Sequence, residues 1–232
     1  MKTSEHVSLP PTNPELLQLI RQKREWHWKP SVAERKAGFR GWHQRGYLPH
    51  FDAPNVTQLV TFLLHDSFPP RRRAEWEPLL SEADHSERRR KLETWLDRGC
   101  GECWLREPAI AAIVENAILA GAASTHYQPL AWVVMLNHVH VVIHITDVPM
   151  TKIIKTWKGS SATTANRRLL RAGSFWQEDY YDTLIRDESH LQKAVRYVEA
   201  NPVKANLVKT SQDWAWSSAR NRDEFGRLQL EH

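Results

Sequence analysis

One apolar stretch, residues 130–145, constrains the fold of this chain more than any other feature. It is broken by one asparagine and three histidines, and in its second half the histidines alternate with valine and isoleucine. A membrane-spanning helix needs about 20 apolar residues, so this stretch is too short and too polar to cross a membrane. The alternation is typical of a strand with one dry face. We predict two strands within residues 129–146 that meet at a tight turn around Leu136 and Asn137.

The rest of the chain predicts shorter strands and several helices. β-Prone runs predict strands at 56–64 and 180–186, whereas residues 38–54, rich in glycine, proline and aromatic residues, have the composition of a loop. Apolar residues at helical spacing predict helices at 15–25, 108–120, 150–170 and 188 to about 200, and residues 82–97 are expected to form a charged helix that ends near Gly99. The last helix should end at Asn201-Pro202, because a residue before proline avoids the helical region. This order predicts an α+β fold with an antiparallel sheet and helices on one face.

Composition indicates a mildly basic globular protein. The 232 residues include 32 Lys and Arg against 27 Asp and Glu, 41% are apolar, and two are cysteines. The apolar fraction excludes wholesale disorder. Two cysteines cannot form a disulfide framework, and the first residues lack the apolar core of a secretory signal, so we expect a reducing, cytoplasmic setting. The basic balance points to a polyanionic partner.

The basic residues are concentrated in two windows. Residues 21–45 contain eight basic residues against two acids, interleaved with aromatic residues, and residues 148–177 contain six basic residues and no acid. Aromatic rings can stack on bases while cations hold phosphates, so both windows are candidate nucleic-acid contacts. For the first window, the alternative is a solvated arm whose aromatic residues pack on the protein. Two further basic runs, at 71–73 and 88–91, lie among acids and predict surface helices with ion pairs.

Two histidines separated by one residue form the sharpest chemical motif. His138 and His140 should point to the same side of a strand, with Cα atoms about 7 Å apart. Two neutral imidazoles can hold one divalent metal ion if a third ligand and waters complete the shell. A pair of surface or hydrogen-bonded histidines without a metal is the alternative. His144 points to the same side, either as a ligand or as a neighbour.

A second motif lies on the helix predicted from residue 188. Tyr197 and Asn201 stand four residues apart and therefore share a helix face. A tyrosine hydroxyl can serve as a covalent nucleophile, and the carboxamide oxygen of Asn201 could reach a metal ion held by histidines on the adjacent sheet. The alternative is a core tyrosine followed by an asparagine that caps the helix.

The remaining motifs indicate neither cysteine chemistry nor nucleotide hydrolysis. Cys100 and Cys103 form a single CxxC pair, which is half a zinc site at best, and their surroundings do not fit a thioredoxin-like strand-to-helix turn. We interpret the pair as part of a loop. The chain also contains no glycine-rich phosphate-binding loop, which disfavours a nucleoside triphosphatase.

Six segments, taken in order, resemble the REP-associated tyrosine transposases, a branch of the single-tyrosine HUH transposases. They are Gly46-Tyr-Leu-Pro-His-Phe-Asp52, Gly101-Glu-Cys-Trp-Leu105, Ala131-Trp-Val-Val-Met-Leu-Asn-His-Val-His140, Phe175-Trp-Gln-Glu-Asp-Tyr-Tyr-Asp182, Tyr197-Val-Glu-Ala-Asn-Pro-Val-Lys204 and Asp213-Trp-Ala-Trp-Ser-Ser-Ala219. Two positions depart from the family pattern. Leu136 stands where the family often has proline, and Asn206 where glycine is common, although asparagine tolerates a left-handed backbone better than most residues.

The resemblance implies a ferredoxin-like antiparallel sheet and metal-dependent cleavage and strand transfer of single-stranded DNA. It assigns Tyr197 as the nucleophile that forms a 5′-phosphotyrosine, and His138, His140 and Asn201 as ligands of Mg²⁺ or Mn²⁺. The implied partner is a DNA hairpin, a REP palindrome with a guide sequence, bound by a nucleoid-associated monomer, with a dimer as the alternative. The implied division is a basic arm with a helix (1–45), the transposase domain (46–210) and a C-terminal tail (211–232).

Candidate DNA contacts come from the basic windows and the segment that follows the first one. They are Arg40, Trp42, Arg45, Tyr47, His50, Lys152, Lys155, Lys158, Arg167 and Arg168. By residue type alone, Tyr180 and Tyr181 are alternative nucleophiles. Two other functions stay open: a domesticated REP hairpin-binding protein without cleavage activity, and a replication initiator or relaxase. The latter proteins usually add a helicase or a second tyrosine, which the motifs of this sequence do not show.

Overall fold

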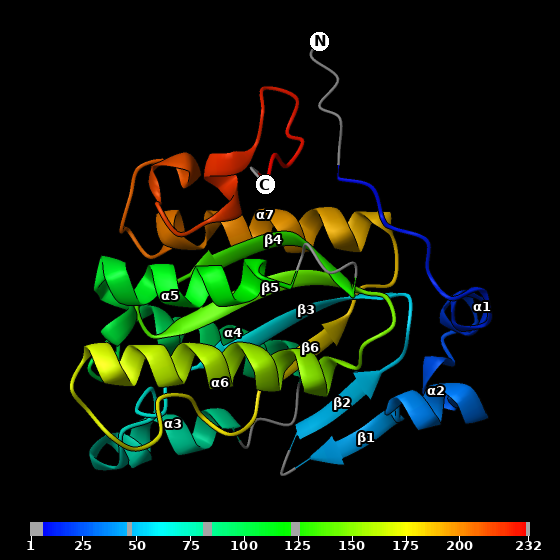
Figure 1. Ribbon diagram of the computed structural model, residues 1–232, viewed down its shortest axis with the longest axis horizontal. Helices are drawn as coiled ribbons and strands as arrows, with labels where there is room; N and C mark the ends of the chain where they lie inside the picture. The colour runs from blue at the N-terminus through cyan, green and yellow to red at the C-terminus, as the bar shows by residue number, and fades with distance from the viewer. Residues whose placement is uncertain (1–6, 46–47, 81–84, 122–125, 231–232) are drawn as a thin grey trace.

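A four-stranded antiparallel sheet forms the centre of the molecule, in the order β4-β5-β3-β6 (Figure 1). The computed structural model describes residues 7–45, 48–80, 85–121 and 126–230. The strands are β3 (Val56–Leu63), β4 (Tyr127–Val134), β5 (His138–Ile145) and β6 (Tyr181–Leu184). β4 and β5 are the two strands predicted from the apolar stretch, and the tight turn between them contains Leu136 and Asn137 as expected.

Helices cover both faces of this sheet. α5 (Pro108–Leu119) and α6 (Met150–Arg168) pack on the face that carries Val139, Val141 and Ile143. The order of these strands and two helices, β-α-β-β-α-β, is ferredoxin-like, so the predicted α+β class is confirmed. α7 (Glu188–Lys204) packs on the opposite face, which corrects the expectation of helices on one face only. Every residue of β5 is buried, and since successive residues point to opposite faces, both faces need a cover.

α7 continues beyond its predicted end. Pro202 lies inside the helix, which ends at Lys204, and Asn206 follows in the left-handed region with a φ of 55°. A proline this close to the C-terminus of a helix removes only its own N–H bond, and the next turn still closes because the Ala205 N–H donates to the Asn201 carbonyl over 2.9 Å. Asn201 is therefore a buried helical residue and does not cap the helix.

A hairpin of two short strands occupies most of the segment predicted as a loop. β1 (Gly41–Arg45) pairs with β2 (Leu48–Asp52), and Leu48 and Phe51 of β2 are buried. Both strands have five residues, and β2 contains Pro49, a residue that occurs mainly in edge strands. Such short strands with a proline leave little periodicity in the sequence, and the hairpin forms because its apolar side chains find a core.

The remaining helices lie before the hairpin and between β3 and β4. They are α1 (Pro14–Arg21), α2 (Val32–Ala37), α3 (Arg73–Leu80) and α4 (His85–Asp97). The predicted surface ion pairs are present on α3 and α4, between Arg73 and Glu77 at 2.7 Å and between Arg90 and Glu87 at 2.6 Å. Within the described ranges, no helix is long and apolar enough to span a membrane.

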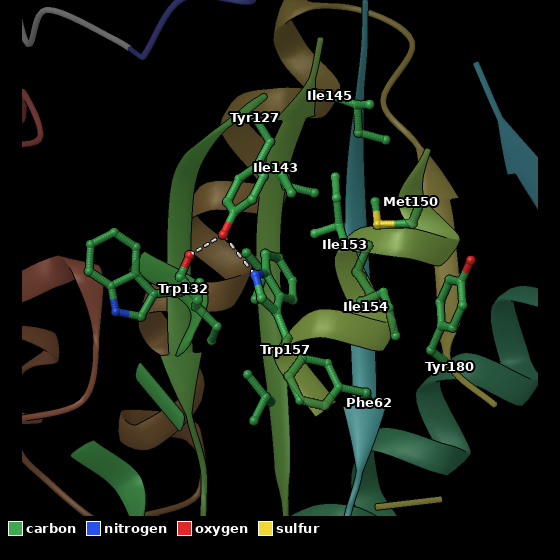
Figure 2. Close-up of a cluster of buried hydrophobic side chains, with 14 of the residues drawn as sticks. Phe62, Tyr127, Trp132, Ile143, Ile145, Met150, Ile153, Ile154, Trp157 and Tyr180 are labelled. Atoms are coloured by element: carbon green, nitrogen blue, oxygen red, sulfur yellow. Dashed lines mark hydrogen bonds between the residues drawn. The ribbon is translucent and has the colours of Figure 1, made fainter. Parts of the chain in front are cut away.

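One buried hydroxyl joins three elements of the main core (Figure 2). The Tyr127 hydroxyl on β4 donates to the Ile118 carbonyl of α5 over 2.6 Å and accepts the indole N–H of Trp157 on α6 over 2.8 Å. Both rings are nearly inaccessible to solvent. The orientation of α5 and α6 over the sheet thus depends on a polar contact inside an apolar cluster.

We expect Tyr127→Phe to lower the free energy of unfolding by about 1–3 kcal/mol, because it leaves the Ile118 carbonyl and the Trp157 N–H without a buried partner. Urea denaturation followed by circular dichroism measures this change. The exposed Trp26→Phe is the control and should shift the midpoint little. An unchanged midpoint for Tyr127→Phe would show that water replaces both contacts.

Candidate active site

The paired histidines lie on the face of β5 that α7 covers. His138 and His140 are 1% and 2% exposed, and their ring centroids are 4.7 Å apart. Both side chains point away from α5 and α6, because they alternate along β5 with the valines that contact those helices. The predicted shared direction of the two imidazoles is therefore confirmed.

The orientation of the His138 ring is set by Asn137. The Asn137 side chain donates through Nδ2 to the Cys100 carbonyl over 3.0 Å, which turns its oxygen, Oδ1, toward His138 Nδ1 at 2.8 Å. Because a carboxamide oxygen can only accept, Nδ1 carries the proton and Nε2 carries a lone pair. Burial lowers the pKa of His138 to about 3, so the ring is neutral at physiological pH.

His140 connects the sheet to α7. Its Nδ1 lies 2.7 Å from the Thr61 hydroxyl of β3, and its Nε2 lies 3.2 Å from the Tyr197 hydroxyl of α7. When Thr61 accepts the Nδ1 proton, Nε2 accepts from Tyr197. The Lys204 ammonium lies 4.8 Å from the centre of the Tyr197 ring.

Asn201 lies one helical turn after Tyr197 on the same face of α7. Its side chain is 2% exposed, and within the described part of the chain its amide makes no hydrogen bond. An amide oxygen on the face of α7 that carries Tyr197, together with two imidazoles whose Nδ1 atoms contact oxygen atoms, fits a mixed nitrogen and oxygen ligand set. Among the described residues, no group of three or more His, Cys, Asp or Glu side chains could hold a metal, so the amide would have to supply the third ligand.

The cationic candidates on α6 divide into two groups. Lys158 donates to the carbonyls of residues 177, 178 and 179, Lys152 donates to the Ala37 carbonyl, and Arg168 pairs with Glu107 at 3.3 Å. Lys155 and Arg167 are exposed, and their side chains make no hydrogen bond or ion pair within the described ranges. α6 lies on the face of the sheet opposite to His138 and His140.

The candidate DNA contacts in the N-terminal part of the chain also differ in position. Arg40 is exposed, and Trp42 is 37% exposed with its ring 5.1 Å from that of Phe51. Arg45 is the last residue of β1, and Tyr47 lies outside the described residues. The structure therefore does not gather all the candidate DNA contacts on one surface.

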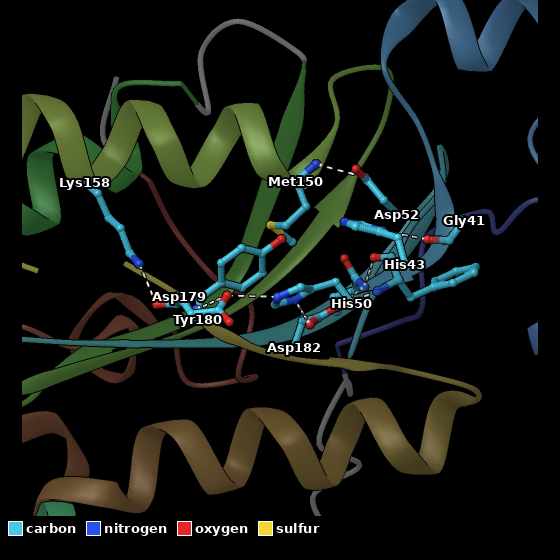
Figure 3. Close-up of polar contacts among 11 residues, drawn as sticks. Gly41, His43, His50, Asp52, Met150, Lys158, Asp179, Tyr180 and Asp182 are labelled. Atoms are coloured by element: carbon cyan, nitrogen blue, oxygen red, sulfur yellow. Dashed lines mark hydrogen bonds and ion pairs between the residues drawn. The ribbon is translucent and has the colours of Figure 1, made fainter. Parts of the chain in front are cut away.

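His50 is buried in an ionic cluster that the motifs do not indicate (Figure 3). Its Nδ1 binds the Asp182 carboxylate at 2.7 Å, and its Nε2 binds the Asp179 carboxylate at 2.9 Å. Burial opposes the charged ring, but the two aspartates outweigh it and raise the pKa of His50 to about 9. With both ring nitrogens bound to carboxylates, this position favours a structural role, the attachment of the β1–β2 hairpin to β6.

The two cysteines lie in a loop between α4 and α5, as predicted. Both thiols are buried and free, and Cys103 has a positive φ of 52°. This loop contributes to the candidate site through its backbone, because the Cys100 carbonyl accepts a hydrogen bond from the Asn137 amide. A contact between a main-chain carbonyl and a side chain 37 residues away leaves no pattern in the sequence.

Comparisons with known proteins agree with this geometry. Residues 105–201, which include both histidines, Tyr197 and Asn201, match a family model described as "Transposase IS200 like". A REP-associated tyrosine transposase of Haemophilus influenzae is 38% identical over 53 residues, 23% of this chain and 30% of that protein. The aligned part thus spans less than a third of the curated relative.

A solved structure shares the fold. It is described as a REP-associated tyrosine transposase bound to a REP hairpin, and it matches with a TM-score of 0.51 at 14% identity over 81% of this chain and 93% of that chain. The family model and the curated relative thus show that part of this chain is similar to IS200-like and REP-associated tyrosine transposases, and the solved structure shows a shared fold.

Proposed function

We propose that the protein cleaves and rejoins single-stranded DNA at REP-type hairpins through a 5′-phosphotyrosine intermediate. The observation that carries this proposal is the 3.2 Å contact between the Tyr197 hydroxyl and His140 Nε2, beside the neutral ring of His138. This contact supports the proposal because a phosphate polarised by an ion at His140 would lie within reach of the Tyr197 hydroxyl. The wider transposase activity is supported by the family model and the curated relative.

His138, His140 and Asn201 would hold Mg²⁺ or Mn²⁺. The bound ion supplies charge that polarises the scissile phosphate. Asn137 accepts the Nδ1 proton of His138 and Thr61 contacts Nδ1 of His140, so each ring would offer Nε2 to the ion, which at His140 would take the place of the Tyr197 hydrogen bond. The mixed donor set suits Mn²⁺ better than an all-oxygen site would.

Tyr197 would act as the nucleophile. Its oxygen bonds to the phosphorus while the bond from phosphorus to the 3′ oxygen of the preceding nucleotide breaks, the tyrosine proton passes to solvent, and the leaving oxygen takes up a proton. The products are a 5′-phosphotyrosine and a free 3′-hydroxyl. The phosphodiester energy stays in the covalent link, so a second 3′-hydroxyl can reverse the step without nucleotide hydrolysis, in agreement with the lack of a phosphate-binding loop.

The test is covalent capture of a labelled REP hairpin oligonucleotide with single-stranded flanks. In Mn²⁺ we expect a protein–DNA adduct that survives denaturing electrophoresis, and none in EDTA. Hairpin binding without any adduct in Mn²⁺ or Mg²⁺ would contradict the proposal and favour a domesticated hairpin-binding protein.

A monomer fits the proposed site, because Tyr197 and His140 of the same chain are in hydrogen-bond contact. Size-exclusion chromatography with light scattering should give a mass near 27.0 kDa for the active species. Active sites that are shared between two copies would instead require a dimer for adduct formation.

We expect the double variant Lys155→Ala and Arg167→Ala to weaken hairpin binding and to lower its salt dependence. Each phosphate contact releases condensed counterions, so the slope of log K against log salt should fall by about 2 when two contacts are lost. Fluorescence anisotropy between 50 and 300 mM salt, in steps of roughly equal log salt, measures this slope. Arg73→Ala, which removes a cation paired with Glu77, is the matched control. Equal slopes for both variants would place the DNA elsewhere.

Asn137→Ala should weaken Mn²⁺ binding by about 10–100-fold, because His138 loses the partner that fixes its tautomer. Isothermal titration calorimetry with Mn²⁺ in the absence of DNA measures the affinity. The exposed Asn116→Ala on α5 is the control for asparagine removal. If folded Asn137→Ala bound Mn²⁺ as tightly as the wild type, the proposed positioning role would be wrong.

A further inference from the structure

The carboxylate of Glu199 connects α7 to β4 through two side chains of the chain that follows the helix. Glu199 Oε1 accepts from the Ser218 hydroxyl over 2.5 Å and from Arg222 Nε over 2.7 Å. The Ser218 oxygen also accepts the backbone N–H of Trp132 over 3.0 Å, and Arg222 Nη2 donates to the Leu130 carbonyl over 2.9 Å. The Arg222 and Glu199 side chains are only 10% and 13% exposed, so solvent screens this ion pair less than an exposed one.

The residues that hold Glu199 belong to a segment that runs along one edge of the sheet. β4 is an edge strand in the order β4-β5-β3-β6. The C-terminal segment, residues 214–222, lies along this edge. Ser217 forms a β-bridge with Val133, and the Val134 N–H donates to the Trp216 carbonyl over 2.8 Å. Glu199 is therefore connected to the backbone of the same sheet that carries the two histidines.

Glu199 and Tyr197 lie on opposite flanks of α7. Between them stands Val198, which is fully buried against the sheet. Successive residues of a helix are turned by about 100°, so Tyr197 and Glu199 point to opposite sides of Val198. Tyr197 contacts His140 of β5, and Glu199 contacts the C-terminal segment beside β4. Any rotation of α7 about its own axis therefore moves both side chains at once.

The rotation of α7 needs a directional contact other than the one that Tyr197 makes. The apolar stripe of α7 keeps the helix on the sheet, but apolar contact is non-directional. The hydrogen bond from Tyr197 to His140 Nε2 is directional, yet an ion bound to that nitrogen would replace it. The contacts of Glu199 lie on the other flank and would remain.

We propose that Glu199 is a positioning residue, which fixes the rotation of α7 and so keeps the Tyr197 hydroxyl within reach of a phosphate at His140; this inference rests on the proposed function. A helix with its side chains has a radius of about 5–6 Å, so a rotation of about 10° moves the end of a side chain by about 1 Å. A displacement of about 1 Å at a reacting atom can slow a reaction by about 10²-fold.

The first measurement is the rate of adduct formation at saturating hairpin and saturating Mn²⁺. We expect Glu199→Ala to slow this rate by about 10²-fold, while the hairpin concentration at half-maximal rate stays unchanged. Glu199→Gln keeps an oxygen that accepts from Ser218 and Arg222, so it should restore most of the rate. Glu115→Ala is the matched control, because Glu115 of α5 pairs with Arg220 of the C-terminal segment at 2.7 Å on the other face of the sheet. It should keep the wild-type rate at temperatures well below its unfolding midpoint.

Arg222→Lys is a milder second variant, which keeps the test decisive if Glu199→Ala does not fold. It retains the positive charge but loses the planar group that contacts Glu199 and the Leu130 carbonyl together. Its rate should lie below that of the wild type and above that of Glu199→Ala.

The second measurement needs neither DNA nor metal. The chain has five tyrosines, so nuclear magnetic resonance of protein isotopically labelled at tyrosine Cζ gives few signals, and Tyr197→Phe identifies one of them. A change in the contact between the Tyr197 hydroxyl and His140 Nε2 alters the surroundings of this carbon. We expect the Tyr197 signal to shift in Glu199→Ala and Arg222→Lys but not in Glu115→Ala.

The two measurements separate positioning from strand transfer. A wild-type rate in folded Glu199→Ala and Arg222→Lys overturns the positioning role, as does an equal loss of rate in Glu115→Ala. A wild type that forms no adduct in Mn²⁺ or Mg²⁺ overturns the strand-transfer proposal. In that case a shifted Tyr197 signal still supports the positioning of Tyr197 by Glu199, whereas an unmoved signal overturns both.

Discussion

Tyr197→Phe should reduce adduct formation by about 10⁴-fold or more while hairpin affinity changes little. The substitution removes one oxygen atom, the one that contacts His140 Nε2 and would attack the phosphorus. The ring can keep its packing against His140 and Lys204, since both contacts involve the aromatic face or edge. Covalent capture measures the first quantity and fluorescence anisotropy the second.

The matched control is Tyr127→Phe, which also removes a buried tyrosine hydroxyl but on the face of the sheet that α5 and α6 cover. It should form adducts at the wild-type rate at temperatures well below its unfolding midpoint. Adduct formation that persisted in Tyr197→Phe would move the nucleophile elsewhere. Tyr181 would then be tested first, because it lines a pocket beside His140.

The hairpin of β4 and β5 was the most predictable part of the fold. The alternation of histidines with valine and isoleucine predicts a strand with one dry face, whereas both faces are covered, because every residue of β5 is buried. The alternation does not reveal what covers each face. The position of α7 against the histidine face depends on Leu191, Val195 and Val198 packing on β4 and β5, a tertiary contact with no local pattern.

The candidate site also has features that the sequence predicts and features that it does not. A period of two brings His138 and His140 together, and a spacing of four brings Tyr197 and Asn201 together, so each pair is predictable from its own element. The link between the pairs comes from the family resemblance. Asn137 and Thr61 could not be identified as partners of the histidines, because one depends on a backbone carbonyl in a distant loop and the other on the register between β3 and β5.

The ionic cluster around His50 should make the stability of the protein fall as the pH rises. The pKa of His50 is raised from 6.5 to about 9 in the folded protein, so its contribution is complete below pH 6.5 and is lost as the pH rises through 9. A shift of this size corresponds to about 3 kcal/mol. The titration of Asp52 also makes the stability fall as the pH rises, but over a lower pH range. Burial raises its pKa to about 7, so its contribution declines between pH values near 4 and 7.

His50→Asn should therefore be less stable than the wild type by about 3 kcal/mol at pH 6 and by much less above pH 9.5, because only the wild type loses the imidazolium in between. Urea denaturation at several pH values measures both proteins, and the difference between them cancels the titration of other groups. His126→Asn is the control, since His126 also bonds an aspartate, Asp147 at 2.9 Å, but is exposed, and an exposed pair contributes little. A constant difference between wild type and His50→Asn across this range would show that His50 is uncharged in the folded protein, and that the β1–β2 hairpin is held to β6 by hydrogen bonds without an ion pair.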